Sequence, residues 1–580
     1  MKIKNRGGAL VILCVVNFLC MLDTTIMTIV VPRLQGAFNA SLGQVSWAVN
    51  LYMIVFATTA LLAARIAELW GENRALFGGI VLFLCGSLAS GCAPTLAWLY
   101  VSRVVQGLGA AVILPLGTII GMQLVSPDRR NQVVAVLGGC QALATAVGPV
   151  VGGWITEQWG WRWVFFVNVP LLAVILLLIP VWMVLATRSR LTLRAIDVPG
   201  AALSMLMLLS LTLGLVKGPD WHWCSPVILG LLFTAGITFC AFIGVECRVA
   251  HPMVDLGLFR SRNFNAAAGA MVGACFFLAG FVILVPTFLV RLHGLTELQA
   301  ALHILPYSGV VFTTTVVASL GMKHINPRII VVGGFGSIGL AYWFLGHMEL
   351  SGYHNLLVGS VLVGLGFGVI AGPAMVWAAA DFTGSRLTVS QSVINVLRQV
   401  GMVLAVAVCM SLFNANLATA KTQVQRYGDS QINQCTLSPR LRQQFRNKLK
   451  THVKRLGAGK EKNTQFKVPQ VTVTSAMKHR AIAQVLAQKT RRGHFSLQQR
   501  QALVQAITPQ VTAQLEAQVN RIQWQVTRVV RRVHREAQTR LCTAFTRIYR
   551  LLLPVAFFGM GWAVIFPRRS QKSNNNIKQK

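Results

Sequence analysis

Long apolar segments recur along most of the chain and are separated by shorter polar ones. One helical crossing of a bilayer core takes roughly 20 apolar residues, and we count fourteen segments of about that length. We therefore predict an all-α membrane protein with 14 transmembrane helices. Their approximate limits are 9–31, 45–64, 76–92, 99–122, 133–155, 163–186, 200–216, 227–245, 266–289, 300–320, 329–345, 356–377, 393–413 and 549–565.

The composition agrees with this prediction. Of the 580 residues, 54% are hydrophobic and only 12% are charged, and the mean hydropathy is +0.60, which excludes an ordinary soluble protein. The first apolar segment is too long for a signal peptide, so we expect it to remain as the first helix. No Cys-x-x-Cys pair or His cluster indicates a metal, and we expect no metal, no other cofactor and no enzymatic activity.

Charged side chains set the expected orientation. Lys and Arg concentrate in alternate short loops, and such loops usually face the cytoplasm. On that basis the loop with Arg65 and Arg74 and the loop with Arg129 and Arg130 are cytoplasmic, as are both termini. We therefore expect a multi-pass protein of the plasma membrane.

One long polar segment interrupts the pattern. Residues 415–547 contain 25 Lys and Arg against 4 acidic residues, a net charge of +21 out of the +37 of the whole chain. The predicted topology places this segment outside, and long loops cross a membrane largely regardless of charge. We expect residues 429–470 to be irregular. Apolar residues from Leu515 to Val533 recur every three or four positions, which predicts a helix leading into the last crossing.

The role of this basic segment stays open at the level of sequence. Such charge usually marks a solvated surface, and contact with anionic envelope material, an anionic substrate or a partner protein is the alternative. Because few aromatic residues accompany the basic ones, we expect no nucleic-acid partner. If the outside is oxidising, Cys435 and Cys542, near the two ends of the segment, would form a disulfide.

Two charged residues inside apolar segments are the main candidates for chemistry. No phosphate-binding Gly-x-x-x-x-Gly-Lys-Ser/Thr motif occurs, so we expect a gradient rather than ATP as the energy source. Asp23 is the acidic residue that lies well inside an apolar segment, where a carboxylate costs about 2.5–3.5 kcal/mol and burial favours its protonated form. It can therefore bind and release a proton, with Arg103 of the fourth helix as its candidate partner. A salt bridge that only orients the helices is the alternative.

Several motifs resemble the fourteen-helix drug:proton antiporters of the major facilitator superfamily, a branch of the multidrug efflux type. Residues 22–32 resemble its first-helix motif, and Trp47 and Tyr52 lie in a segment similar to the start of its second helix. Arg103, Gln106, Gly107 and Gly109 match its fourth-helix motif. The resemblance implies a major facilitator fold, with two six-helix bundles plus two inserted helices, in a bacterial inner membrane. It also implies that Asp23 and Arg103 couple protons and that Trp47, Tyr52 and Gln106 contribute to a substrate cavity.

The fifth helix carries a segment similar to the antiporter motif of this branch, with Ala144 in place of its first glycine. Pro149 removes a backbone donor and bends the helix, while Gly148, Gly152 and Gly153 allow close helix contact. Simple helix packing would use the same residues, so the motif supports an antiporter only through the resemblance.

One loop departs from the pattern of this family, and one arginine matches the pattern weakly. Glu68, Gly71 and Arg74 occupy the conformational gating loop of the family, but Leu69 replaces its arginine, and a solvated charged loop is the alternative. Arg398 lies at the start of the thirteenth helix. We expect it to reach the membrane surface rather than the cavity.

These features divide the chain into five parts. They are an N-terminal six-helix bundle (1–186), two inserted linker helices (187–262), helices of the C-terminal bundle (263–414), a basic and partly helical extracytoplasmic loop (415–547), and the last helix with a basic cytoplasmic tail (548–580).

The sequence favours a proton-coupled secondary transporter that exports small amphiphilic molecules, such as drugs, toxicants or a siderophore, by alternating access. A proton-coupled importer of the same fold is one alternative. A membrane-anchored protein that docks envelope material through the basic loop is another. The expected partners are a small-molecule substrate and the lipid bilayer, with a periplasmic adaptor protein or anionic envelope material left open.

Overall fold

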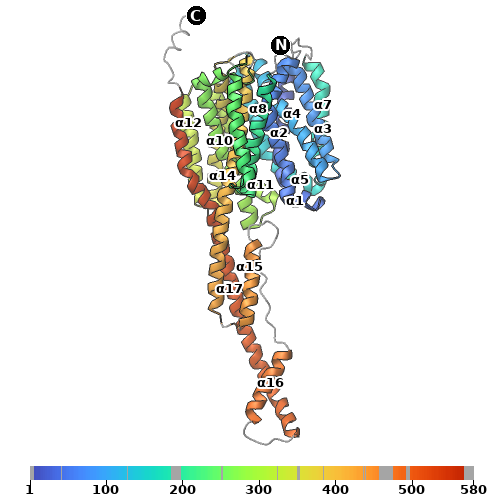
Figure 1. The fold of residues 1–580 in the computed structure, drawn as a ribbon, viewed down its shortest axis with the longest axis vertical. Helices are drawn as coiled ribbons and strands as arrows, with labels where there is room; N and C mark the ends of the chain where they lie inside the picture. The colour runs from blue at the N-terminus through green and yellow to red at the C-terminus, as the bar shows by residue number, and fades with distance from the viewer. Residues whose placement is uncertain are drawn as a thin grey trace. The chain divides into compact units, whose positions relative to one another are not determined.

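The computed structural model describes residues 5–40, 42–126, 129–183, 197–249, 252–322, 324–348, 353–382, 385–435, 437, 439–455, 475–490 and 497–566. Within these ranges the chain is helical and contains no β-strand (Figure 1). The helices of the first half are α1 (Arg6–Ala37), α2 (Leu42–Trp70), α3 (Glu72–Gly91), α4 (Leu96–Gln123), α5 (Arg130–Gln158), α6 (Trp163–Phe166), α7 (Asn168–Trp182), α8 (Val198–Trp221) and α9 (Pro226–Glu246). Those of the second half are η3 (Leu256–Arg260), α10 (Arg262–His293), α11 (Glu297–Gly321), α12 (Pro327–Gly346), α13 (His354–Ala379), α14 (Ser385–Asn433), α15 (Pro439–Arg455), α16 (Ser475–Thr490), α17 (Leu497–Gly561) and η4 (Trp562–Ile565).

Thirteen helices in the described ranges are long and apolar enough to cross a membrane. The consecutive helices α6 and α7 form one of these crossings, Trp163–Trp182, and the two parts of α5 form a fourteenth if they count as one. The predicted all-α fold with fourteen crossings is therefore confirmed. The predicted end of the sixth crossing, 184–186, lies outside the described residues.

Several helix boundaries follow local sequence signals. Ser225 caps the start of α9 and is followed by Pro226 at the first helical position. At the start of α11, Thr296 and Gln299 form a reciprocal capping box. The α10 helix ends at His293 and is capped by Gly294, whose φ of +65° is a conformation that glycine adopts without steric cost.

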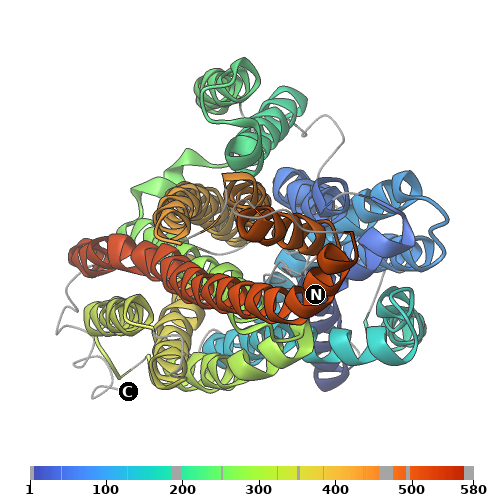
Figure 2. The same ribbon diagram turned by 90° about the horizontal axis from the view of Figure 1, so that it is seen from below.

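The chain divides into two compact units. Unit 1 comprises residues 1–414 and 545–580 and holds the fourteen crossings. Its first bundle is built by packing of α3 on α4, α2 on α4 and α1 on α5, and its second by packing of α13 on α10, α11 and α12. The inserted helices α8 and α9 pack on each other at the edge of the unit (Figure 2), and α8 also contacts α2. The two bundles meet where α5 packs along α11.

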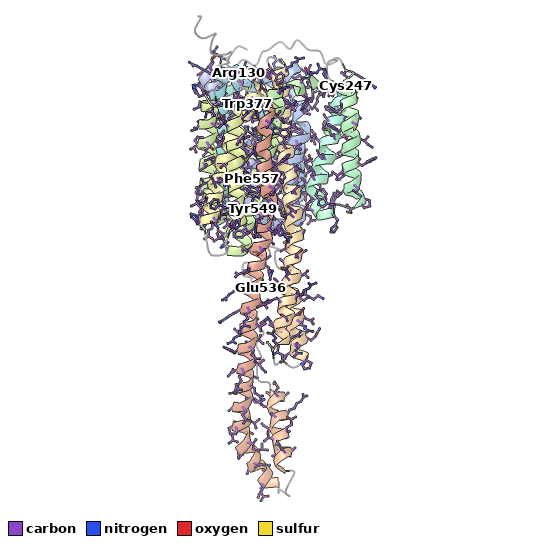
Figure 3. The ribbon with its side chains drawn as sticks, turned by 90° about the vertical axis from the view of Figure 1, so that its left-hand side faces the viewer. Arg130, Cys247, Trp377, Glu536, Tyr549 and Phe557 are labelled. Carbon is purple, nitrogen blue, oxygen red and sulfur yellow. The ribbon has the colours of Figure 1, made fainter. Side chains whose placement is uncertain are left out.

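The last part of α17 completes the second bundle of unit 1. Tyr549 and Phe557 lie on this part of the helix (Figure 3). The ring of Tyr549 stands 5.1 Å from that of Tyr342 on α12, and a side chain at Gly339 on the same helix would collide with Phe557. The indole nitrogen of Trp562 donates a hydrogen bond to Ala266 O on α10, at 3.1 Å.

Unit 2, Ala415–Ala544, has a small core of its own. The second part of α14 and the first part of α17 run antiparallel within it, as Asn416 donates to Ala544 O at 3.1 Å and Arg532 donates to Gln431 Oε1 at 3.3 Å. The buried residues of this core are Val424, Ile432, Cys435, Leu437, Phe445, Leu449, Val453, Val526, Val529, Val530, Val533 and Ala537. The predicted helix leading into the last crossing is confirmed, because α17 is continuous from Leu497 to Gly561.

Two predictions about this unit are wrong. Residues 429–433 and 439–455 are helical, not irregular. The apolar residues of α15 recur four apart at Leu441, Phe445, Leu449 and Val453, a period hidden by the basic residues among them. Residues 434, 435 and 437 are not helical, and 436, 438 and 456–470 lie outside the described residues.

The predicted Cys435–Cys542 disulfide is also contradicted, because the structure does not bring these two cysteines together. Cys435 donates a weak hydrogen bond to Gln431 O at 3.4 Å. Since Gln431 faces Arg532 across the antiparallel pair, Cys542 lies some ten residues further along α17. At about 1.5 Å of rise per residue, the sulfur of Cys542 is too far from that of Cys435 for a disulfide.

Candidate functional site

The centre of the first bundle holds a buried ion pair between α1 and α4. Arg103 Nη1 donates to Asp23 Oδ2 at 2.6 Å, and both side chains are at most 1% exposed. The predicted association of these two residues is therefore present in the structure. Apolar helix faces carry both residues into the bundle, where an unpaired charge would be strongly unfavourable.

A polar network completes the coordination of this pair. Gln106 Nε2 donates to Asp23 Oδ1 at 2.9 Å and to Ser87 Oγ at 2.8 Å. Arg103 donates through Nη1 to Gln106 Oε1 at 2.6 Å and through Nε to Ala48 O at 3.1 Å. Its guanidinium also lies 4.4 Å from the centre of the Tyr52 ring. Each oxygen of the Asp23 carboxylate thus has its own donor.

The glycines of the fifth-helix motif bring α5 against two neighbouring helices. A side chain at Gly148 would collide with Thr25 Oγ1, and one at Gly152 would lie 2.8 Å from Ile26 Cγ2, both on α1. A side chain at Gly153 would lie 3.1 Å from Leu298 on α11 of the second bundle. The motif therefore forms the contact of α5 with α1 and part of its contact with α11.

Close to this motif α5 changes direction. Its two parts, Gln132–Thr145 and Val147–Gln158, meet at 41°. Pro149 lies one turn beyond the bend, where its missing N–H and its ring disrupt the helix. Ala144 O, beside the bend, accepts a 3.5 Å hydrogen bond from Thr25.

The predicted gating loop is a sharp break between α2 and α3. Gly71 joins the two helices with a φ of +89°, which favours glycine because other residues meet steric strain there. The Arg74 side chain is exposed on the first turn of α3. Glu68 belongs to the last turns of α2, and its side chain is outside the described part of the chain.

A cavity of about 110 Å³ lies between the two bundles. Four methionines contribute to its wall, together with polar groups such as Gln141, Tyr307 and Arg398. The complete lining is Met21, Thr118, Val134, Leu137, Gly138, Gln141, Thr145, Met271, Cys275, Leu278, Tyr307, Val311, Thr315, Phe367, Ala371, Gly372, Met375, Arg398 and Met402.

None of the three residues predicted to contribute to a substrate cavity belongs to this lining. Tyr52 and Gln106 are buried in the network around Asp23 and Arg103. Trp47 lies between α2 and α8, where Lys217 Nζ stands 4.6 Å above its ring and the ring of Trp221 is 6.5 Å away. Of the three predicted residues, Tyr52 and Gln106 thus belong to the ion-pair network, and Trp47 belongs to the contact between α2 and α8.

Arg398 is placed differently from the prediction. It lies at the wall of the cavity and does not extend to the membrane surface, so that prediction is wrong. Its Nη1 donates to Gln141 Oε1 at 2.9 Å, and its Nη2 lies 3.9 Å from Met21 Sδ. Gln141 in turn donates to Asn17 Oδ1 at 3.1 Å. Because Gln141 holds the guanidinium from the opposite bundle, the side chain turns inward.

Family comparison agrees with this architecture. The sequence matches the Major Facilitator Superfamily over residues 13–406, which include both the ion pair and the cavity. The chain belongs to this superfamily. It is therefore a membrane transporter of the major facilitator type, and unit 2 lies outside the matched residues.

Two curated relatives and one solved structure show what this transporter resembles. "Multidrug resistance protein Stp" of Mycobacterium tuberculosis is 28% identical over 415 residues, 70% of this chain and 76% of Stp. "Fatty acid resistance protein FarB" of Neisseria gonorrhoeae is 28% identical over 414 residues, 70% of this chain and 80% of FarB. The human organic anion transporter MFSD10 (TETRAN) has a TM-score of 0.52 at 14% identity, covering 70% of this chain and 93% of that one, and so shares its fold.

Sequence reasoning missed several cavity residues of this transporter. Gln141 and Thr145 lie two turns and one turn before Gly148, on the same face of α5. Asn17 and Gln141 are isolated polar residues within apolar segments, which is itself a signal of function. The four cavity methionines, by contrast, are indistinguishable in sequence from ordinary apolar residues. No cluster of three or more metal-type side chains occurs in the part of the chain that the structure describes.

Proposed function

We propose that this transporter exports small amphiphilic molecules in exchange for protons that bind at Asp23. The observation that carries the proposal is the Asp23–Arg103 pair, in which the charge of a buried carboxylate is compensated by the guanidinium of Arg103. A proton on Asp23 removes the charge that Arg103 compensates, so protonation changes the most costly interaction in the first bundle.

The packing of α1 offers a route from this proton to the cavity. Asp23 lies on α1 two and three residues before Thr25 and Ile26, which contact Gly148 and Gly152 of α5. The α5 helix packs along α11 of the other bundle and carries Gln141 at the cavity wall. A shift of α1 on protonation would therefore act on the contact between the bundles, as rocking of one bundle against the other requires.

The direction and the substrate class are inferred from the relatives and the cavity. Stp and FarB are named for resistance to drugs and to fatty acids, which supports export. A mostly apolar wall with a few polar groups suits an amphiphile. The same relatives are bacterial proteins, and we place the chain in the inner membrane with both termini in the cytoplasm and unit 2 outside.

A proton gradient is sufficient as the energy source, and the proposal includes no cofactor. One proton moving inward supplies about 2.3 kcal/mol per 100 mV of membrane potential and about 1.4 kcal/mol per pH unit. These values support a gradient of several hundredfold for a neutral substrate.

Substrate-evoked proton movement in proteoliposomes tests the proposal. The native chain and Asp23→Asn are compared with a panel of lipophilic drugs and organic anions, with binding measured in parallel. Asp429→Asn is the matched control, because Asp429 lies in unit 2, is 39% exposed and makes only a 3.9 Å ion pair. We expect proton movement to be lost in Asp23→Asn while binding survives, and to be unchanged in the control.

Two results would contradict the proposal. Equal proton movement by the native chain and Asp23→Asn would show that another group couples protons. No proton movement by the native chain with any compound would remove the antiporter function altogether.

A further inference from the structure

The cavity wall carries a positive charge and no negative one. Arg398 is the charged residue among the described lining residues, and none of them is an aspartate or a glutamate. The described residues also provide no carboxylate within ion-pair distance of Arg398. A guanidinium stays protonated under all physiological conditions, so this charge is permanent.

Only one side of this guanidinium is engaged. Nη1 donates to the neutral amide oxygen of Gln141. Nη2 faces the sulfur of Met21 at 3.9 Å, and a thioether is a weak acceptor. Nε is buried without a hydrogen-bond partner among the described residues. The Nε and Nη2 donors form one of the two parallel forks with which an arginine binds a carboxylate in bidentate fashion.

A buried cation without a counter-ion is costly to any membrane protein. The Asp23–Arg103 pair shows that this fold can supply a carboxylate to a buried arginine. At Arg398 the described residues supply only an amide and a thioether. The electrostatic environment of this site is therefore completed only when an anion enters the cavity.

We propose that Arg398 is the anion-binding group of the cavity and that the transported molecules are amphiphiles with a single negative charge, such as a carboxylate. This inference rests on the export function proposed above and specifies its substrate class. The anion occupies the Nε and Nη2 fork, and the flexible side chain of Met21 moves aside to admit it.

The remainder of the cavity suits the apolar part of such a molecule. Met271, Met375 and Met402 are unbranched and adapt to ligands of different shape. The volume of about 110 Å³ accommodates a headgroup, whereas sites for drug-sized ligands usually measure about 300–1,000 Å³. The bundles must therefore separate further to receive the whole molecule.

Binding of two amphiphiles that differ only in charge tests the proposal. Dodecanoate and dodecyltrimethylammonium, both below their micelle concentrations, are titrated at pH 8 into the full chain in nanodiscs of zwitterionic lipid. We expect the native chain to bind dodecanoate at least tenfold more tightly than dodecyltrimethylammonium. In Arg398→Gln the affinity for dodecanoate should fall by roughly 10- to 100-fold, with no loss for the cation.

Three further variants separate charge, geometry and general effects. Arg398→Lys keeps the charge but loses the fork and should retain part of the preference. Arg398→Glu should reverse the preference in favour of the cation. Arg260→Gln removes the same charge from an exposed position and should behave as the native chain. Unchanged dodecanoate binding in Arg398→Gln, or a native preference for the cation, would overturn the proposal.

The net charge that the native chain moves in each transport cycle is a second test, and it needs no variant. Exchange of one inward proton for one outward monoanion moves two positive charges inward. The same exchange moves one charge for a neutral substrate and none for a monocation. Proton-coupled transport of dodecyltrimethylammonium without transport of dodecanoate would overturn this inference and leave the export function intact. Absence of coupled transport for every compound would contradict the export function, while the binding comparison would still decide the role of Arg398.

Discussion

Unit 1 contains a buried arginine, Arg103, and a half-buried one, Arg398, in opposite electrostatic environments. Arg103 is fully buried and paired with Asp23 at 2.6 Å, with Gln106 bonded to both. Arg398 has an amide and a thioether as neighbours, and no acidic side chain within reach in the described part of the chain. The comparison indicates that the two arginines have different functions. In the first bundle the protein provides the counter-ion of Arg103, whereas in the cavity between the bundles a ligand provides the counter-ion of Arg398.

The α5 helix connects the two sites. It packs against α1, which carries Asp23, through Gly148 and Gly152. Two turns before Gly148, its Gln141 binds Arg398. A change at the ion pair can therefore reach the cavity through a single helix.

The largest expected effect comes from removing the counter-ion of Arg103. Asp23→Asn leaves a fully buried guanidinium without a carboxylate, and we expect the free energy of unfolding to fall by about 3–5 kcal/mol. Thermal unfolding of the purified protein followed by fluorescence measures this change. The double variant Asp23→Asn/Arg103→Gln should recover most of the loss. If the single variant is as stable as the native chain, the pair contributes no net stability, and the proposed difference between Arg103 and Arg398 is wrong.

A smaller effect is expected at the contact that joins the two sites. In Gly148→Ala and Gly152→Ala the added methyl group collides with Thr25 or Ile26, and we expect a loss of about 1–3 kcal/mol together with slower transport. Gly78→Ala is the matched control on α3, because nothing lies within 4 Å of the added carbon. It should be neutral or stabilising, since alanine favours the helix. Equal results for the three variants would show that the α1–α5 contact is not close.

Removal of the cavity charge should act in the opposite direction on stability. Arg398→Gln deletes a cation that has no counter-ion among the described residues, so we expect the ligand-free protein to be unchanged or more stable by about 1–2 kcal/mol. The same unfolding measurement, without and with dodecanoate, checks this prediction. Dodecanoate should raise the unfolding temperature of the native chain and leave that of the variant unchanged. A marked loss of stability in the ligand-free variant would mean that Arg398 has a structural role.

The smallest effect on transport is expected from deletion of unit 2. Residues 415–544 form a separate compact unit, and its two ends are joined by the hydrogen bond from Asn416 to Ala544. A short Gly-Ser linker between Asn414 and Phe545 should therefore leave both arginine sites and proton-coupled transport in place. Flux assays in proteoliposomes decide this point. Loss of all activity would favour the alternative in which the chain acts by docking through its basic loop.

Much of the fold and part of the site could be predicted from sequence. Hydrophobic length identifies the membrane crossings because the bilayer imposes a minimum length on every helix. The pairing of Asp23 with Arg103 was predictable since buried charges in the first bundle are so few that they must find each other. The α15 helix was missed because its apolar stripe is narrow and surrounded by basic residues.

The tertiary structure decided which polar residues share a cavity and which do not. Trp47 and Gln106 lie in apolar helices like the cavity residues, yet the rotation of α2 and α4 directs them to α8 and to the ion pair. The thiols of Cys435 and Cys542 are kept apart by the register of two antiparallel helices, which their spacing in sequence does not reveal.

The sequence by itself determined that this protein is a fourteen-helix major facilitator transporter with a carboxylate and an arginine buried in its first bundle. It indicated Arg103 as the partner of Asp23, but it placed Arg398 at the membrane surface. Only the tertiary structure shows that Arg398 faces the cavity with no counter-ion among the described residues. The physical reason is that the energy of a buried charge depends on the atoms within a few ångströms, and helices far apart in sequence supply those atoms.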